Sequence, residues 1–522
     1  MKIFAGVFSV QVGRPGRNAE EMIRLMTENE ADVYLFPAYS LTGATCSNAV
    51  NFAGFAERTN EALDRLCEYT EETHKCLVTA VAGYENIIIR DGELIQKPAI
   101  TMEGKRVMVA ASGQEEGADV LLLPTAMDGY PCIQNDIIEF CAESSKQRKC
   151  VIAVANCGFG ESSADHVYKG FAGVFHNGVI LDFKSQDTPE PVFAQADSES
   201  VSGLIYTRPK RGLDRIPYYG NNDSDRYLDE LFKMQVQALY MRLVGTGIRR
   251  LILGLSGGLD STTALLVSEA AMKMAGLPVS DIITVTMPGF GTSDRTKSNA
   301  LELMALLGTT AREVDIKESV LTHFAAIGHN PEDASVVYEN AQARERTQVL
   351  LDMANQFSAL VVGTGDLSEE AQGFCTFGGD NTAHYNPNAT VPKTLLRAMI
   401  SRIAATRGGD VGRILQDIVD TPISPELKPG QKTEDIIGPY ELLDFYLFFF
   451  AKRHASYEDI KHYALAVFEE YDEDEIVHWL DSFFARYKAS RFKRATIFEG
   501  ANLIGFTLPY VPADVDFDFA NL

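Results

Sequence analysis

Short apolar runs alternate with amphipathic segments over roughly the first 200 residues. The runs with the length and composition of buried strands are MKIFAGVFSV, ADVYLFPAYS, KCLVTAVAGY, ADVLLLPTA and KCVIAVANCGFG. Segments of helical periodicity lie between them, for example Asn18 to Asn29 and Cys132 to Lys149. Strands that alternate with helices predict an α/β layer structure for this part of the chain.

The periodicity is lost between Gln186 and Asn222, where Pro, Gly, Ser and Asp gather. This composition predicts a linker, with a domain boundary near Tyr219 to Ser224. A long helix, DRYLDELFKMQVQALYMRLVGTG, then leads into the strand, glycine-rich turn and helix of RRLILGLSGGLDSTTALLVSEAAMKMAG. Further strands, at DIITVTMPG, AREVDI and ALVVGTGD, predict a doubly wound parallel sheet, and the last ~90 residues are expected to be helical.

Length and charge narrow the function classes. The 522 residues exceed what one ordinary hydrophobic core accommodates, so we expect two domains. The formal net charge of −25 argues against a general binder of nucleic acid or anionic membranes, which needs a basic surface. We expect no secretory signal and no membrane span, because the longest apolar runs, such as LLDFYLFFFA, are short. The eight cysteines show no close metal-like pairs and indicate reduced thiols, so a cytoplasmic location is expected.

The stretch SGGLDS, Ser256 to Ser261, carries the clearest chemistry. Two glycines after a buried strand let the backbone curl, so that N–H groups and the positive end of the next helix converge on one anion. The serines add hydroxyl donors, and Asp260 offers a hard oxygen ligand for Mg²⁺. No Lys-Ser/Thr pair follows the glycines, so this is not a Walker-type loop. The whole string resembles the pyrophosphate loop of the ATP pyrophosphatases, which cleave ATP between its α and β phosphates.

Further motifs narrow the resemblance. These are TMPGFGTSDRT, ENAQARERTQ, VVGTGDLSEEAQGF, VPKT, TPISPEL, TEDIIGPYELLDF and FKR, in that order along the chain. Together they resemble the NAD⁺ synthetases of the long, glutamine-dependent type, from about Asp225 to Arg494. The resemblance implies that ATP adenylates the nicotinate carboxylate of deamido-NAD⁺, and that ammonia then displaces AMP. It also implies an N-terminal nitrilase-like α-β-β-α sandwich, over residues 1–220, joined to a Rossmann-like ATP-pyrophosphatase domain with a helical C-terminal extension, over residues 225–522.

The resemblance assigns roles by position. It implies an ATP site at Gly254, Leu255, Ser256, Gly257, Gly258, Leu259, Asp260, Ser261, Thr364 and Lys393. Asp260 and Glu369 would hold Mg²⁺, and Lys393 would neutralise a phosphate, which makes these three the predicted catalytic residues. The predicted contacts to deamido-NAD⁺ are Asn340, Arg344, Glu369, Phe374, Asp380 and Lys493. Asn340 and Arg344 are four residues apart and are expected on one face of a helix.

Residue type alone would support plainer interpretations of several of these positions. Arg344 could belong to a solvated helix face, Glu369 to a surface turn with the next glutamate, and Asp380 to a turn. Lys393, after a proline, could be a surface lysine. Phe374 departs from the family, which has Trp after that glycine; phenylalanine keeps a stacking face for the nicotinate ring but has less area and no N–H donor.

The first domain keeps the frame of the family's glutamine-hydrolysing amidase but not its catalytic residues. FPAYSLTG matches the frame of Phe-Pro-Glu-Leu-x-Leu-Thr-Gly, and places Ala38 at the position of the glutamate base. RVMVAASGQ places Ser112 at the position of the cysteine nucleophile, and neither Lys97 nor Lys105 clearly takes the place of the family's lysine. A serine hydroxyl needs an adjacent base, and the base is the residue replaced. We therefore predict a domain without glutaminase activity.

Alternatives remain open. The amidase site could be displaced onto Cys132 or Cys157, with Glu115, Glu116 or Glu161 as acids, in a working glutamine-dependent enzyme. The chain could also be an adenylating ligase of the same group with another acceptor, or a non-catalytic scaffold. We expect a homo-oligomer, small-molecule partners (deamido-NAD⁺, ATP and ammonia), ammonia from solution or from a separate donor protein, and no nucleic acid or membrane partner.

Overall fold

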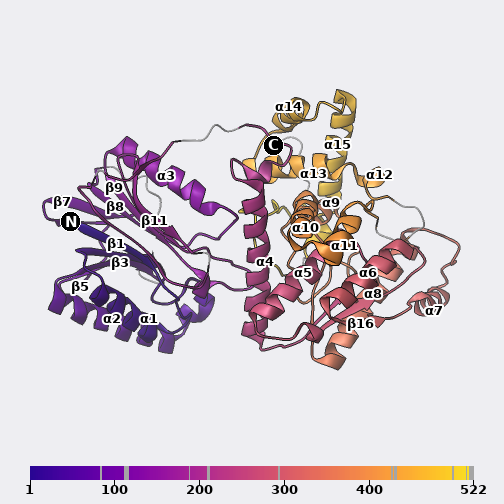
Figure 1. Cartoon of the computed structure of the whole chain (residues 1–522), viewed down its shortest axis with the longest axis horizontal. Helices are drawn as coiled ribbons and strands as arrows, with labels where there is room; N and C mark the ends of the chain where they lie inside the picture. The colour runs from indigo at the N-terminus through magenta and orange to yellow at the C-terminus, as the bar shows by residue number, and fades with distance from the viewer. Residues whose placement is uncertain are drawn as a thin grey trace. The chain divides into compact units, whose positions relative to one another are not determined.

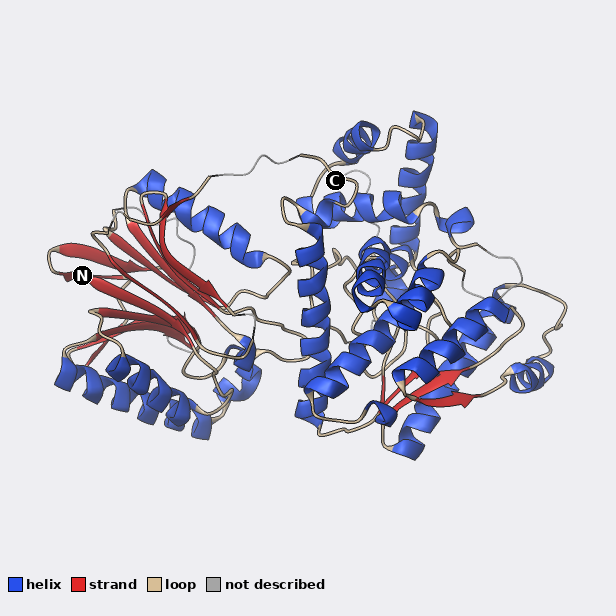
Figure 2. Cartoon of the chain, in the orientation of Figure 1, coloured by secondary structure: helices blue, strands red, loops and turns tan. Residues whose placement is uncertain are grey.

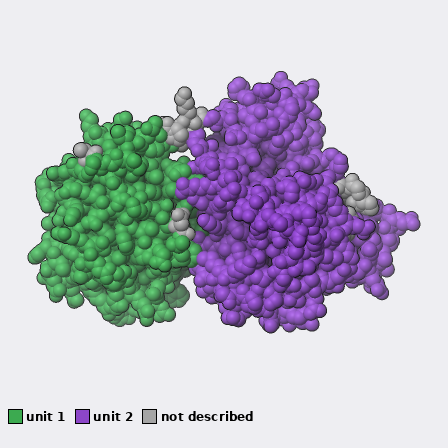
Figure 3. Space-filling view, in the orientation of Figure 1, with its two compact units in different colours: residues 1–210 green, residues 211–522 purple. Residues whose placement is uncertain are grey.

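The computed structural model of the chain describes residues 1–82, 85–110, 117–186, 188–200, 202–207, 212–291, 294–424, 427, 432–496, 499–512 and 514–515. The chain folds into two compact units, residues 1–210 and 211–522 (Figure 3). No helix within the described ranges is both long enough and apolar enough to cross a membrane.

The first unit contains strands and a few helices. Its strands are β1 (Lys2–Val7), β2 (Val33–Ala38), β3 (Cys76–Val81), β4 (Glu85–Arg90), β5 (Glu93–Ile95), β6 (Ala99–Met102), β7 (Lys105–Val109), β8 (Val120–Thr125), β9 (Val151–Asn156), β10 (Phe171–His176), β11 (Val179–Ser185), β12 (Val192–Asp197) and β13 (Leu204–Ile205). Its helices are α1 (Pro15–Glu28), α2 (Ala53–Thr73) and α3 (Ile133–Arg148), with 3₁₀ turns η1 (Ala44–Asn51) and η2 (Phe159–Glu161).

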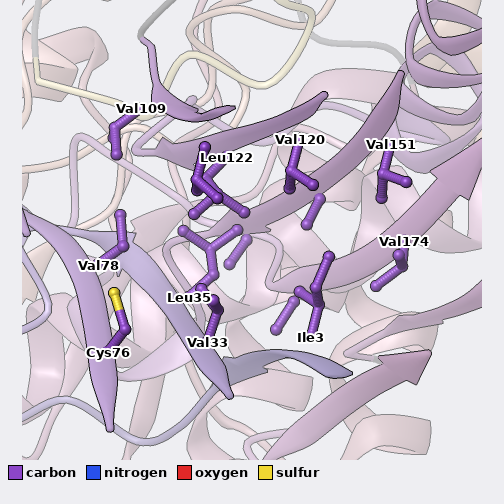
Figure 4. Close-up of a cluster of buried hydrophobic side chains, with 14 of the residues drawn as sticks. Ile3, Val33, Leu35, Cys76, Val78, Val109, Val120, Leu122, Val151 and Val174 are labelled. Atoms are coloured by element: carbon purple, nitrogen blue, oxygen red, sulfur yellow. The ribbon is translucent and has the colours of Figure 1, made fainter. Parts of the chain in front are cut away.

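These strands form two sheets packed face to face (Figure 2). Within the described residues, one sheet has the order β12-β1-β2-β3-β4-β5 and the other the order β13-β11-β10-β9-β8-β7-β6. Alternate residues of each strand face the interior between the sheets, so Ile3 and Val33 meet Val120 and Val174 in one buried cluster (Figure 4).

The outward residues of both sheets are also apolar, because helices cover them. Phe4 and Phe36 cluster with Met22 of α1 and Leu66 of α2, and Ile152 clusters with Cys141 of α3. Figure 1 shows α1 and α2 beside one sheet and α3 beside the other. Strands buried on both faces read as continuous apolar runs, which explains why the sequence marks them so clearly. The predicted α-β-β-α sandwich is confirmed.

One prediction for this region is wrong. The segment from Gln186 to Asn222 was expected to be a linker, yet it contains β12, which pairs antiparallel with β1 along its whole length. β12 is an edge strand of mixed composition, VFAQAD, with Ala194 buried. An edge strand exposes one side and carries few apolar residues, so local composition does not distinguish it from a loop.

The second unit is mainly helical around a small sheet. It comprises η3 (Pro217–Tyr219), α4 (Ser224–Thr246), β14 (Leu251–Gly254), α5 (Leu259–Met274), η4 (Val279–Asp281), β15 (Ile282–Thr286), α6 (Asp294–Leu307), β16 (Thr310–Glu313), α7 (Lys317–Ile327), α8 (Val336–Phe357), β17 (Leu360–Val361), α9 (Leu367–Gln372), α10 (Lys393–Arg407), α11 (Gly409–Val419), α12 (Glu434–Ile437), α13 (Tyr440–Leu447), η5 (Phe448–Lys452), α14 (Tyr457–Val467), α15 (Glu473–Ala489) and α16 (Arg491–Arg494).

The sheet has the order β16-β15-β14-β17, with every described pair parallel. The carboxyl ends of the strands therefore share one edge, and the chain leaves β14 and β17 there before turning into α5 and α9. This edge is where open parallel sheets bind their ligands. The predicted doubly wound sheet and helical C-terminal region are confirmed.

Candidate active site

A cavity of about 630 Å³ opens at the carboxyl edge of the sheet in the second unit. Its walls come from the loop after β14, from α8, from the loop after β17 and from the segment that follows α11. Of the predicted residues, those in its wall are Gly254, Leu255, Ser256, Gly258, Leu259, Asp260, Ser261, Asn340, Thr364, Glu369, Phe374, Asp380 and Lys493. One concave site therefore brings together residues that are up to about 240 positions apart in the sequence.

The loop from Ser256 to Ser261 is tightly curled. The Ser256 Oγ atom accepts a hydrogen bond from Gly258 N at 3.2 Å and lies 3.1 Å from Ser261 Oγ, whose oxygen also accepts from Ser256 N. Gly257 has a φ of +88°, and a Cβ atom there would lie 2.2 Å from the carbonyl oxygen of Thr296. Only glycine fits this position, and α5 begins at Leu259, within this stretch, so its N-terminus faces the cavity.

Three carboxylates surround a buried ammonium beside this loop. Lys393 is 1% exposed, and its Nζ atom lies 2.7 Å from both oxygens of Asp260, 2.7 Å from Asp366 Oδ2 and 2.9 Å from Glu369 Oε1. The ring of Tyr440 lies 5.3 Å from the same atom. The plainer alternative, that Lys393 is a surface lysine, is wrong, because its side chain is buried among these partners.

Burial and mutual charge shift the pKa values of the groups in this cluster. Burial raises the pKa of Asp366 and raises that of Glu369 to about 7, while the Lys393 ammonium opposes both shifts. Burial alone would lower the pKa of Lys393, but the carboxylates of Asp260, Asp366 and Glu369 outweigh it and raise that pKa well above its ordinary value. The lysine therefore stays charged at neutral pH.

The carboxylates also fit a hard divalent cation. One oxygen from each of Asp260, Asp366 and Glu369 lies within 4.8 Å of the others, but only Asp260 and Glu369 reach the cavity wall, where an ion could enter. Carboxylate oxygens are the donors that Mg²⁺ prefers. Sequence reasoning missed Asp366, although the spacing Asp-x-x-Glu at the start of α9 is a helix-capping signature that could have identified it.

The far wall holds the residues predicted to contact a dinucleotide. Asn340 Oδ1 accepts a hydrogen bond from Thr376 Oγ1 at 2.8 Å, and Asp380 Oδ1 accepts from Thr376 N at 2.7 Å. The Lys493 ammonium donates to the carbonyl oxygens of Gly373 and Cys375, at 2.6 and 2.7 Å, and so brackets Phe374 between them. These contacts tie the three segments of this wall together.

Arg344 does not share the cavity face with Asn340. Its side chain is exposed, and its Nε atom donates to the carbonyl oxygen of Phe377 at 3.2 Å. The face of α8 that lines the cavity passes instead through Asn340, Ala343, Arg346 and Leu350. Sequence reasoning therefore missed Arg346, which lies half a turn from Arg344, because the orientation of a helix is set by packing rather than by spacing.

Asn388 is a third residue that sequence reasoning missed. Its Nδ2 atom donates to the carbonyl oxygens of Asp260 and Thr364, at 2.9 and 3.1 Å, and its Oδ1 atom accepts from Gln235 of α4. It thus fixes the β14 loop to the β17 loop. No local sequence signal marks an asparagine for this role.

In the first unit, Ala38 ends β2 and is buried, and its carbonyl oxygen accepts a hydrogen bond from Cys157 Sγ at 3.1 Å. Burial, and next the charge of Glu161, raises the pKa of the Cys157 thiol well above its ordinary value. Cys132 is buried at the start of α3. Ser112, Glu115 and Glu116 lie outside the described residues.

Glu161 is fully buried, and burial raises its pKa to about 7. Its two oxygens accept hydrogen bonds from Ala44 N at 3.1 Å and from Gly158 N at 3.2 Å. Thr45 Oγ1 also donates to the Glu161 carbonyl oxygen at 2.8 Å. This carboxyl group therefore fastens the loop after β2 to the turn after β9.

One known protein family and several individual proteins are similar to this chain. The family model "NAD synthase" matches residues 231–496, about half of the chain. A glutamine-dependent NAD(+) synthetase of Mycobacterium leprae is 39% identical over 323 residues, 56% of this chain and 48% of that one, so the match spans about half the length of that relative. One of Xanthomonas campestris is 24% identical over 516 residues, 88% of this chain and 89% of that one.

The fold of the whole chain also has a solved counterpart. The crystal structure of a glutamine-dependent NAD(+) synthetase from Cytophaga hutchinsonii superimposes with a TM-score of 0.70 at 16% identity, covering 96% of this chain and 95% of that one. At this identity the likeness concerns the fold. The match of the family model over the unit that holds the cavity is the decisive finding, and this chain belongs to the NAD synthase family.

Proposed function

We propose that the protein makes NAD⁺ from deamido-NAD⁺, ATP and ammonia, and releases AMP and pyrophosphate. The observation that carries the proposal is one cavity that combines the Ser256–Ser261 anion loop with the carboxylates of Asp260 and Glu369 beside the Lys393 ammonium. An anion cradle next to acidic metal ligands suits a reaction in which one phosphate-bearing substrate loses pyrophosphate.

ATP would bind with its phosphates over the loop. The hydroxyl groups of Ser256 and Ser261 and the first N–H groups of α5 supply preorganised donors, and Thr364 would contact the nucleotide from the loop after β17. Asp260 and Glu369 would hold Mg²⁺, which supplies charge neutralisation at the phosphates when bound. Lys393 would add a fixed positive charge behind them, close to where negative charge develops on the leaving pyrophosphate.

Deamido-NAD⁺ would lie along the wall formed by Asn340, Phe374, Asp380 and Lys493. Its nicotinate ring would stack on Phe374, with the carboxylate directed at the α phosphorus of ATP. In the first step a carboxylate oxygen bonds to that phosphorus as the bond to the β-phosphate oxygen breaks. In the second, ammonia attacks the acyl carbon, AMP leaves with the carboxylate oxygen, and the nitrogen gives up one proton to form the amide.

We further propose that the first unit no longer hydrolyses glutamine. Ala38 offers a methyl group where a base is needed, and a methyl group accepts no proton. The displaced-site alternative gains no support from Cys157, because its thiol is fully buried, donates to Ala38 O and has a raised pKa. A nucleophilic cysteine needs a lowered pKa and access to substrate. Glu161, its neighbour, is occupied by two backbone N–H groups.

The test is NAD⁺ formation by purified protein from deamido-NAD⁺, ATP and Mg²⁺, with ammonium chloride in one reaction and ammonia-free glutamine in the other. We expect activity with ammonium alone. Comparable activity with glutamine would support the working amidase suggested by the names of the relatives, and no activity with either nitrogen donor would contradict the proposed acceptor. Asp260→Ala is the matched inactive control, since it removes one carboxylate from the cavity wall.

A further inference from the structure

Asp366 differs from the other two carboxylates around Lys393 in where it lies. Asp260 and Glu369 are in the cavity wall, with side chains 23% and 18% exposed, whereas the Asp366 side chain is 0% exposed. The cavity wall, as far as its residues are described, includes neither Asp366 nor Lys393. Asp366 therefore contacts the ammonium from the side that faces away from the ligand space.

The two oxygens of Asp366 have different neighbours: one accepts a hydrogen bond and the other forms an ion pair. Its Oδ1 atom accepts a hydrogen bond from Glu369 N at 2.8 Å and so caps α9, while its Oδ2 atom lies 2.7 Å from Lys393 Nζ. The neighbours in these two contacts are a backbone N–H and an ammonium, and both suit a carboxylate. One side chain thus fixes both the backbone that carries Glu369 and the ammonium of Lys393.

The surroundings make this anchor rigid. Lys393 N donates to Ser368 Oγ at 2.9 Å, and Leu367 N donates to Val391 O at 3.1 Å. Asp444 of α13 accepts from Thr394 N and from Ser368 Oγ. The first turns of α9 and α10 are therefore bound to each other and to α13, so Asp366 cannot readily turn toward the cavity.

The consequence concerns competition between two cations. The Lys393 ammonium now shares Asp260 and Glu369, the two carboxylates that a divalent cation entering from the cavity would need. When those carboxylates turn to such a cation, the ammonium loses attraction and gains repulsion from a charge of +2. Only an anion that stays out of reach of the cavity can hold the lysine in place without competing for the metal.

We propose that Asp366 is a positioning residue: its buried carboxylate is the fixed counter-ion of Lys393 and frees Asp260 and Glu369 to bind a divalent cation. This inference rests on the proposed function for the identity of the cation and of the phosphate ligand. Asp366 acts through Lys393 and does not itself bind the metal.

Asp366→Asn is the sharpest test, because asparagine caps a helix as well as aspartate does and removes only the charge. The readout is the rise in unfolding temperature of the protein with ATP as Mg²⁺ is titrated, each variant being compared with its own metal-free baseline. We expect the Mg²⁺ concentration for half of the rise to increase about tenfold or more, as for other groups that support metal ligands. Asp472→Asn is the control, because Asp472 caps α15 through Glu475 N at 2.8 Å and is exposed.

A double variant distinguishes a positioning role of Asp366 from direct binding of the metal by Asp366. In a Lys393→Met background, Asp366→Asn should leave the Mg²⁺ requirement where Lys393→Met alone puts it. A further increase there would mean that Asp366 binds the metal and would overturn the inference. Should Lys393→Met fail to fold, an unchanged Mg²⁺ requirement in Asp366→Asn alone overturns it equally.

This measurement uses only ATP and Mg²⁺, so it does not depend on the acceptor. A wild-type protein that shows the Mg²⁺-dependent rise but makes no NAD⁺ would contradict the proposed function and leave this inference standing. A protein that makes NAD⁺ while Asp366→Asn titrates like wild type would contradict this inference and leave the proposed function standing.

Discussion

Gly257 provides the strictest test of the proposed phosphate-binding loop, Ser256 to Ser261. Its φ of +88° is strained for any residue with a side chain, and the Cβ atom of alanine would lie 2.2 Å from Thr296 O, which belongs to the backbone of α6 and cannot rotate away. The conformation costs alanine about 1–2 kcal/mol. Relief of the overlap costs about 1–3 kcal/mol more, because either the loop or α6 must shift.

We therefore expect Gly257→Ala to lower the free energy of unfolding by about 2–5 kcal/mol. Gly276→Ala is the matched control: its φ is +67°, but no atom lies within 4 Å of the added Cβ, so only the conformational cost of about 1–2 kcal/mol applies. Urea unfolding of both variants measures the difference. Equal losses would refute the steric part of the reasoning.

The functional effect should separate the two variants further. A loop displaced by about 1 Å no longer aims its donors at the phosphates, so we expect kcat/KM for ATP to fall about 100-fold in Gly257→Ala, which is about 2.7 kcal/mol of transition-state stabilisation. Gly276→Ala should retain activity. A folded Gly257→Ala protein with wild-type kcat/KM would show that this loop does not bind the phosphates.

Three further predictions concern single side chains. Lys393→Met should abolish NAD⁺ formation and, because it leaves three carboxylates without their ammonium, lower the free energy of unfolding by about 3–5 kcal/mol in urea titrations. Ser112→Ala should leave NAD⁺ formation from ammonium unchanged in a coupled dehydrogenase assay. Glu161→Gln should remove one pH dependence of stability: the folded state binds the Glu161 proton more tightly than the unfolded state does, so titration of Glu161 lowers the wild-type free energy of unfolding by about 3 kcal/mol as the pH rises from its ordinary pKa of 4.5 to its folded pKa of about 7.

The results that would contradict these predictions are distinct. Substantial activity in Lys393→Met would remove the lysine from the mechanism. A Ser112→Ala protein that lost glutamine use but kept ammonia use would mean that the first unit is a working amidase. Stability curves of wild type and Glu161→Gln that run parallel from pH 4.5 to 7 would mean that Glu161 does not titrate there.

Much of the architecture was predictable, because the relevant signals are local. Strands buried on both faces, such as Val33–Ala38 and Val151–Asn156, are continuous apolar runs, and the helices between them carry a 3.6-residue period. The strand, glycine turn and helix around Ser256–Ser261 were predictable for the same reason, since they are contiguous. A short string of residues is enough where one turn of backbone makes the site.

Other features depended on contacts between distant segments. β12 is an edge strand only because β1 pairs with it, and nothing in VFAQAD specifies that partner. The orientation of α8, which directs Arg346 rather than Arg344 to the cavity, is set by the surfaces on which the helix packs. Periodicity records which residues of an element share a face, not where that face points.

The ionic cluster shows the same limit most clearly. The sequence by itself predicted functional roles for Asp260, Glu369 and Lys393, but it could not show that the lysine is enclosed by three carboxylates or that Asp366 is one of them. Lys393 and Asp260 are 133 residues apart, and the pKa of each group in the cluster depends on the burial and charge of the others. Only the tertiary structure decides such an arrangement, because burial and electrostatic interaction depend on distances in space that local sequence does not record.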